Sequence, residues 1–177
     1  MNVKPAALVV AGLVASGFLG YWIGRGQARV ELQPSLPDSK PVSAPERNYD
    51  PGDHYVDHVV DGDSVWLRKD DRLLEVRLLR VDTPERDESG YKEATEELQR
   101  LLGDESSIRL EFEEERTDDH GRTLAYLFVE GRNINVDMVR SGWSPFFDRY
   151  GRGKYARDFE AAESEARRDR RGTWANR

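Results

Sequence analysis

The stretch that decides the expected fold is Val59–Glu85, VVDGDSVWLRKDDRLLEVRLLRVDTPE. Residues 64–68 and 73–81 have the apolar pattern of strands, and the acidic and glycine residues that bound them are turn signals. The stretch therefore predicts paired strands with polar side chains collected at the turns and at the far end. Those side chains are Asp61 and Asp63 around Gly62, Arg77 within the second strand, and Asp82, Thr83 and Glu85 after it.

Segments on both sides of this stretch add further short strands and helices. An apolar edge followed by Gly103 predicts a helix over 91–102. Five short strands, a helix after the third and helices at the end of the chain predict an α+β domain, namely a five-stranded OB-fold barrel with three helices. The other expected elements are strands over 55–60, 108–112 and 124–129, helices over 134–142 and 154–171, and Trp174 folding back as a packing anchor.

The N-terminal region, residues 1–28, contains an uncharged segment that predicts a single transmembrane helix. Residues 6–24 would form about 29 Å of helix, and a bilayer core is about 30 Å thick. Tyr21 and Trp22, near the end of this segment, are residue types that favour the membrane interface. A cleaved signal peptide is the alternative, since residues 15–17 are small enough for a cleavage site. Small residues at every fourth position would allow weak helix pairing, although glycine is common in membrane helices: Gly12, Ser16, Gly20 and Gly24.

Residues 29–52 predict a Pro-rich linker, and residues 53–177 predict the folded domain. Five prolines and few apolar residues in the linker favour an extended spacer that cannot bury enough surface to fold. The chain has no cysteine, so any bound metal would be a hard cation held by oxygen or imidazole ligands. Residues 50–177 hold 22 Lys and Arg against 31 Asp and Glu. This acidic balance disfavours nucleic-acid binding unless local arginines or a bound cation outweigh it.

The polar side chains of Val59–Glu85 are the residue types that phosphodiester hydrolysis requires. Carboxylates can hold a divalent cation, arginines can fork onto phosphate oxygens, and a further carboxylate can activate water. Asp63 and Asp82 are candidate metal ligands, with the backbone carbonyl of Thr83 as a third, because Ca²⁺ prefers oxygen donors. Each residue also has a structural alternative. The Asp61–Asp63 segment is a common turn signal, and Thr83–Glu85 looks like the start of a helix.

Two motif blocks resemble the staphylococcal nuclease (thermonuclease) family. That family has a DGD[ST] turn followed by R-L-x-x-[VI]-D-[TA]-P-E, and this chain has DGDS at 61–64 and RLLRVDTPE at 77–85. The next block of the family, R-T-D-x-x-G-R-x-L-A-Y, corresponds to RTDDHGRTLAY at 116–126. Ser164–Ala166 and Trp174 are similar to the family's C-terminal pattern, so the resemblance covers roughly residues 54–175.

The resemblance implies an OB-fold barrel and a Ca²⁺-dependent endonuclease that acts on DNA and RNA and leaves 3′-phosphates. It also implies a role for each matching position. The metal ligands would be Asp63, Asp82 and the Thr83 carbonyl. The phosphate-binding pair would be Arg77 and Arg122, the general base would be Glu85, and Asp61 would add negative potential.

The chain departs from a well-known member of the family at positions that bind substrate. The loop after Glu85 is short and acidic, whereas that member has a longer, lysine-rich loop. His120 and Asp148 stand where that member has tyrosines, although Tyr150 remains. Because the catalytic positions are kept while binding positions differ, we predict a working enzyme with weaker or different substrate affinity.

Two other functions are compatible with the sequence. One is a non-catalytic OB-fold module that binds nucleic acid or a protein, and the other is a hydrolase of a different phosphate ester. A tethered nonspecific nuclease is safer outside the cytoplasm, where Ca²⁺ is also plentiful. The domain, expected to be monomeric, is therefore predicted on the extracytoplasmic side of a membrane, or secreted if residues 6–24 are cleaved.

Overall fold

The computed structural model describes residues 49–104 and 106–175. The expected anchor, its small-residue stripe and residues 29–48 of the expected linker lie outside the described residues. In the part of the chain that is described, no helix is long and apolar enough to cross a membrane.

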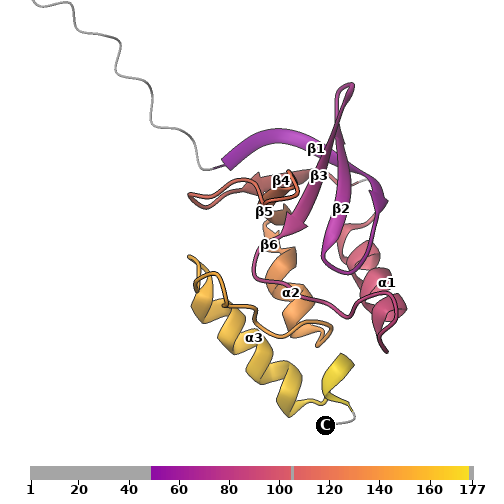
Figure 1. Ribbon diagram of the computed structural model, residues 1–177, viewed down its shortest axis with the longest axis vertical. Coiled ribbons are helices and arrows are strands. Elements are labelled where there is room, and N and C mark those ends of the chain that lie inside the picture. The colour runs from indigo at the N-terminus through magenta and orange to yellow at the C-terminus, as the bar shows by residue number, and fades with distance from the viewer. Residues whose placement is uncertain (1–48, 105, 176–177) are drawn as a thin grey trace, which may run out of the picture. The chain divides into compact units, whose positions relative to one another are not determined.

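Five strands close into a barrel (Figure 1). Strands β3 and β5 pair in parallel, with Arg77 opposite Leu124, and this pairing closes the ring β1–β2–β3–β5–β4. The two-residue strand β6 pairs with β5 and extends that edge. The barrel confirms the fold expected from the sequence. Its strands are β1 (Tyr49–Val59), β2 (Ser64–Lys69), β3 (Arg72–Leu78), β4 (Ile108–Glu111), β5 (Thr123–Val129) and β6 (Arg132–Asn133).

The pairing of β2 with β3 brings the first residues of the candidate site together. Val65 and Val76 face each other and are fully buried, whereas Leu73 on the other side of the ribbon is 54% exposed. This is the alternation that a half-buried ribbon requires. In the same register Ser64 lies opposite Arg77, so the turn before β2 meets the end of β3.

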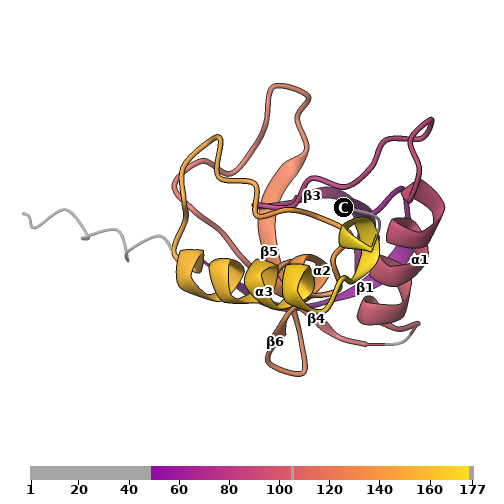
Figure 2. The same ribbon diagram turned by 90° about the horizontal axis from the view of Figure 1, so that it is seen from below.

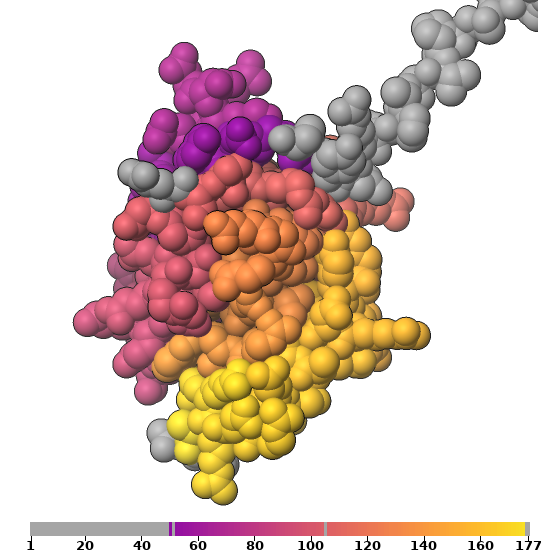
Figure 3. Space-filling model, turned by 180° about the vertical axis from the view of Figure 1, so that it is seen from behind, coloured from indigo at the N-terminus to yellow at the C-terminus, as the bar shows by residue number. Residues whose placement is uncertain are grey.

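Three helices cover one end of the barrel. Helix α2 lies against the barrel and α3 runs across α2, as the two views in Figures 1 and 2 show. Seen from behind, in Figure 3, the surface around residues 130–140 lies between those of α1 and α3. The helices are α1 (Tyr91–Leu102), α2 (Ile134–Arg140) and α3 (Ala156–Arg168), followed by the short 3-10 helix η1 (Gly172–Trp174).

Aromatic side chains attach α3 to the rest of the domain. Phe159 is fully buried and stacks on Phe146 with 5.1 Å between the ring centroids. Trp174 packs back onto α3, as expected, with the guanidinium carbon of Arg167 4.2 Å from its ring centroid. Helix α3 begins at Ala156 and ends before the expected residue 171, because Arg170 has a φ of 53°, which a right-handed helix does not accommodate.

The loop after β3 differs from its expected conformation. Strand β3 ends at Leu78 instead of continuing to residue 81, because Arg80 adopts a left-handed conformation with a φ of 65°. Helix α1 begins only at Tyr91, so the interpretation of Thr83–Glu85 as a helix start is wrong. These residues form an irregular loop, and their side chains serve no helix cap. At the other end of the domain, β1 begins at Tyr49, before the expected domain boundary at residue 53.

Glu111, at the end of β4, ties the barrel to the chain just before α3. Its carboxylate accepts hydrogen bonds from Lys154 Nζ (2.6 Å), from the Tyr155 hydroxyl (2.6 Å) and from Arg109. Burial alone would raise the pKa of Glu111, but these three donors lower it to about 2. The contact therefore contributes stability that is complete above the ordinary pKa of 4.5 and is lost as the pH falls toward 2.

We expect Glu111→Gln to lower the free energy of unfolding by about 1–2 kcal/mol at pH 7, allowing for solvent screening of this partly exposed group. The loss should shrink as the pH falls below 4.5, because the wild-type carboxylate is then increasingly protonated in the unfolded chain. Urea denaturation at several pH values measures both quantities. A loss that is the same at pH 7 and near pH 2 would show that the charge of Glu111 contributes nothing.

Candidate active site

Asp63 is a buried acid whose two carboxylate oxygens are both engaged. It is 8% exposed, and its own backbone N–H donates to the Asp61 carboxylate at 3.1 Å. Thr83 donates to Oδ2 from its backbone N–H (3.0 Å) and its hydroxyl (3.1 Å). Oδ1 accepts from the Ser64 hydroxyl and pairs with Arg77, both at 3.1 Å. Burial raises the pKa of Asp63 to about 6 against the opposing effect of Arg77, so near that pH a proton competes with any cation.

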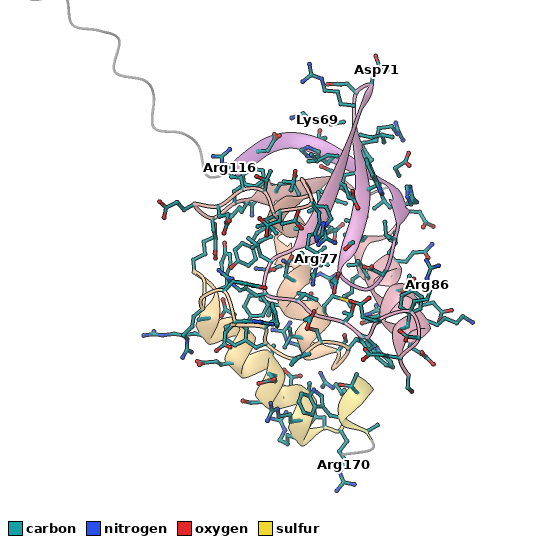
Figure 4. The ribbon with its side chains drawn as sticks, viewed as in Figure 1. Lys69, Asp71, Arg77, Arg86, Arg116 and Arg170 are labelled. Atoms are coloured by element: carbon teal, nitrogen blue, oxygen red, sulfur yellow. The ribbon has the colours of Figure 1, made fainter. Side chains whose placement is uncertain are left out.

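Arg77 lies at the end of β3, away from Lys69 and Asp71 at the other end of the β2–β3 hairpin (Figure 4). Its Nη1 donates to the backbone carbonyls of Val81 (2.7 Å) and Leu78 (3.2 Å). These two bonds hold the guanidinium plane in a fixed orientation. Its Nη2 lies 3.4 Å from Oδ1 of Asp82 and its Nη1 lies 3.1 Å from Oδ1 of Asp63. One guanidinium thus lies between two acids that the sequence predicts as metal ligands.

Arg122 reaches the same turn from the connection between β4 and β5. Its Nε donates to the Asp118 carboxylate at 2.8 Å, and its backbone N–H donates to the same carboxylate at 2.9 Å. Burial alone would raise the pKa of Asp118, but these bonds lower it, so Asp118 stays ionised and orients the arginine. Nη1 of Arg122 lies 3.5 Å from the Ser64 hydroxyl, which donates to Asp63. Ser64 therefore connects the second arginine to the buried acid.

The loop after β3 holds the remaining predicted residues at different depths. Thr83 is buried, whereas Asp82 is exposed and its backbone N–H donates to the Ser144 hydroxyl at 2.8 Å. Glu85 is exposed, and its backbone N–H donates to the Glu88 carboxylate at 2.9 Å. Within the described residues, no hydrogen bond or ion pair engages the Glu85 carboxylate itself. That carboxylate is therefore open to solvent.

A cavity of about 580 Å³ opens beside the two arginines, a size within the range of small-molecule sites. Of the predicted site residues, Arg77, Asp82 and Arg122 line it, while Asp63, Thr83 and Glu85 do not. Residues of the segments 113–122 and 147–150, which rise on one side of the molecule (Figure 2), form much of its wall, and Leu78–Val81 and Leu124 complete it.

The candidate metal ligands near Arg77 are all oxygen atoms, which is the ligand type that a hard cation takes. The carboxylates of Asp63 and Asp82 both approach the guanidinium of Arg77, at 3.1 Å and 3.4 Å. Every donor is an oxygen, as Ca²⁺ requires. Among residues 49–104 and 106–175, no group of three or more acidic or histidine side chains could hold a metal ion. Further ligands would therefore be backbone carbonyls, such as that of Thr83, or water.

Two residues that position the site are not predicted from the sequence. Ser144 accepts the backbone hydrogen bond of Asp82, and nothing in its surrounding sequence marks it. Asn135 is fully buried in α2; it accepts from the Leu127 backbone N–H (3.0 Å) and donates to the carbonyl of Leu79 (2.9 Å). It thereby fixes the loop after β3. A polar residue on the apolar face of 134–139 was the available signal, since buried amides are hydrogen-bonded.

Comparison with known proteins identifies relatives of this chain. Residues 75–176 match the family model described as Staphylococcal nuclease homologue. The thermonuclease of Staphylococcus intermedius is 31% identical over 129 residues, which is 70% of this chain and 77% of that protein. The thermonuclease of Staphylococcus hyicus is 29% identical over 127 residues, 68% of this chain and 75% of that protein. Endonuclease YncB of Bacillus subtilis (strain 168) is 29% identical over 127 residues, 68% of this chain and 60% of that protein. Because the family model covers more than half of the sequence, the chain belongs to the staphylococcal nuclease family.

Proposed function

We propose that this protein is a nuclease that hydrolyses phosphodiester bonds of DNA or RNA with Ca²⁺ as its cation. The relatives named as thermonucleases and endonucleases support this proposal. The observation that carries it is the convergence of Arg77 and Arg122 on the turn that holds Asp63, with Asp82 on the other side of Arg77. Binding a diester together with a cation requires both signs of charge in this kind of arrangement.

Each residue of the site has a separate role in the proposed reaction. Arg77 and Arg122 bind the non-bridging phosphate oxygens and stabilise the negative charge that grows on them in the transition state. Glu85 removes a proton from water, whose oxygen forms the new bond to phosphorus while the P–O5′ bond breaks. The departing 5′-oxygen takes up a proton, so the products are a 3′-phosphate and a 5′-hydroxyl. Bound Ca²⁺ would neutralise charge on the diester, and the residues that would hold it are Asp63, Asp82 and the Thr83 carbonyl.

The acidic wall of the cavity weakens the expected binding of a nucleic-acid substrate. Glu113–Glu115, Asp118 and Asp119 line the same cavity as Arg77 and Arg122. Their charges repel the phosphate backbone, which favours weaker binding than a basic site would give. This wall also favours the second candidate function, a non-catalytic barrel whose partner is a protein. The converging carboxylates and arginines favour the nuclease, because a binding module has no need of a site for a divalent cation.

We further propose that residues 6–24 tether the protein to a membrane, with the barrel on the extracytoplasmic side. The uncharged length of this segment and the proline-rich spacer after it support the proposal. Protease added to intact cells should digest the barrel domain if it lies on the cell surface. Complete protection would contradict a cell-surface location and favour a periplasmic one.

Substitution of Glu85 tests the nuclease proposal. We expect Glu85→Gln to slow cleavage of a single-stranded oligonucleotide in Ca²⁺ by between about a hundredfold and ten-thousandfold, because the amide cannot take the proton of water. Glu93→Gln removes the same charge from the first turn of α1 and is the matched control, with an unchanged rate expected. Equal rates for the wild type and Glu85→Gln would refute the assignment. No cleavage by the wild type of DNA or RNA with any divalent cation would favour the binding module.

A further inference from the structure

Arg80 is a buried arginine in the wall of the cavity, and the proposed reaction does not use it. It is 8% exposed and pairs with the Glu113 carboxylate. Its Nη1 donates to the backbone carbonyl of Tyr150 at 3.2 Å, and its own carbonyl accepts from the backbone N–H of Phe147 at 3.2 Å. One residue at the end of β3 therefore makes two backbone hydrogen bonds to the segment 147–154.

Glu113 extends these contacts to the barrel and to the far end of the same segment. Its carboxylate accepts from the hydroxyl of Tyr126, a fully buried residue of β5, and from the backbone N–H of Lys154 at 3.3 Å. Burial and Glu113 raise the pKa of Tyr126, so its hydroxyl remains a donor at neutral pH. Arg80, Glu113 and Tyr126 thus form one group, the Arg80 cluster, that binds segment 147–154 at three backbone positions.

Gly153 shows how closely the segment passes over the Arg80 cluster. Its φ is +69°, and an added Cβ would lie 2.9 Å from Nε of Arg80 and closer still to Glu113 and Tyr126. Real Cβ atoms are not found at such distances. A larger residue at this position would lift the segment off the cluster.

The segment held in this way carries the aromatic part of the cavity wall. The side chain of Tyr150 is 73% exposed, and its ring meets that of Phe147 edge to face at 5.7 Å between centroids. Both residues line the cavity that Arg77 and Arg122 also line. Aromatic faces beside phosphate-binding cations suit a nucleotide, whose base can stack while its phosphate is held.

We propose that Arg80 is a positioning residue that fixes this aromatic wall relative to the two phosphate-binding arginines. It acts through segment 147–154 and touches no reacting atom. The ligand class is the nucleobase attached to the bound phosphodiester, so this inference rests on the proposed function. Loss of the Arg80 cluster weakens substrate binding more than it slows the chemical step, because Arg77, Arg122 and Glu85 keep their own contacts.

The test compares the full-length protein with Arg80→Met and Gly153→Ala. Arg157→Met, an exposed arginine on α3, is the charge-matched control. In both cluster variants we expect KM for a short oligonucleotide to rise about tenfold with kcat within about twofold, since a displaced wall binds the base poorly. The backbone amides of Phe147 and Lys154, read by hydrogen exchange, should exchange at least about tenfold faster. The control should match the wild type in both measurements.

The two readouts separate this proposal from the proposed nuclease activity. Absence of wild-type cleavage would defeat the nuclease proposal, and with it the assignment of a base-binding wall. Unchanged amide exchange in both cluster variants would overturn the positioning role of Arg80 whatever the activity. A fall in kcat with KM unchanged would also overturn it. Gly153→Ala leaves Arg80 in place, so it decides the outcome if Arg80→Met does not fold.

Discussion

Arg77→Lys is expected to lower the rate of phosphodiester cleavage by roughly a thousandfold while the protein remains folded. Lysine keeps a positive charge near Asp63, so the buried acid is not left without a counter-charge. It cannot, however, bond to the Val81 and Leu78 carbonyls and still present two parallel donors to a phosphate. Initial rates over a range of oligonucleotide concentrations measure the loss.

Arg68→Lys is the matched control for this prediction. Arg68 is an exposed residue of β2 whose strand partner is Leu73, toward the far end of the same ribbon from Arg77. The same substitution there should leave the cleavage rate within about twofold, because exposed charges far from a site contribute little. If the Arg77→Lys protein is folded and its cleavage rate is within about tenfold of the wild-type rate, the hypothesis that Arg77 binds phosphate through two parallel donors is wrong.

Asn135→Ala is expected to have the largest effect on stability, a loss of about 3–5 kcal/mol in the free energy of unfolding. The fully buried amide accepts from Leu127 and donates to the carbonyls of Leu79 and Ala125, at 2.9–3.0 Å. Alanine removes the amide and leaves buried backbone groups without these partners. Urea denaturation with a two-state fit measures the loss.

Asn133→Ala is the internal comparison, since it makes the same substitution two residues earlier. The Asn133 side chain caps α2 by accepting from the backbone N–H of Val136 at 3.3 Å, in a partly buried position. Loss of such a cap costs about 1 kcal/mol. If Asn135→Ala lowers the free energy of unfolding no more than Asn133→Ala does, the three hydrogen bonds of Asn135 do not support the fold.

Local apolar periodicity correctly predicted the helices and strands whose buried side chains recur at regular spacing. Helix α1 begins and ends where its apolar edge and Gly103 indicate, and β2 and β3 follow the alternation that buries Val65 and Val76. The early end of β3 was missed, because nothing in an apolar run marks Arg80 as left-handed. Closure through the parallel β3–β5 pairing joins residues far apart in the chain, which local periodicity cannot specify.

The candidate site was predicted to the extent that its residues lie within motifs. Asp63, Thr83, Arg77 and Arg122 come together around Ser64, because β2 pairs with β3 and β3 pairs with β5. Other residues hold these groups in place, and of these Ser144 and Asn135 lie outside the motifs. Ser144, Asn135 and the Arg80 cluster act through contacts to backbone atoms, and a sequence carries no record of which backbone a side chain will meet.

The proposed Ca²⁺-dependent nuclease activity can be measured as cleavage of a 5′-labelled single-stranded oligonucleotide by the full-length protein, in Ca²⁺ and after chelation. We expect fragments that end in 3′-phosphate in the presence of Ca²⁺ and none after chelation, with activity restored by added Ca²⁺. Such products would show that the convergent arginines and carboxylates hydrolyse the P–O5′ bond. Cleavage that persists unchanged in chelator, or fragments that end in 3′-hydroxyl, would contradict it.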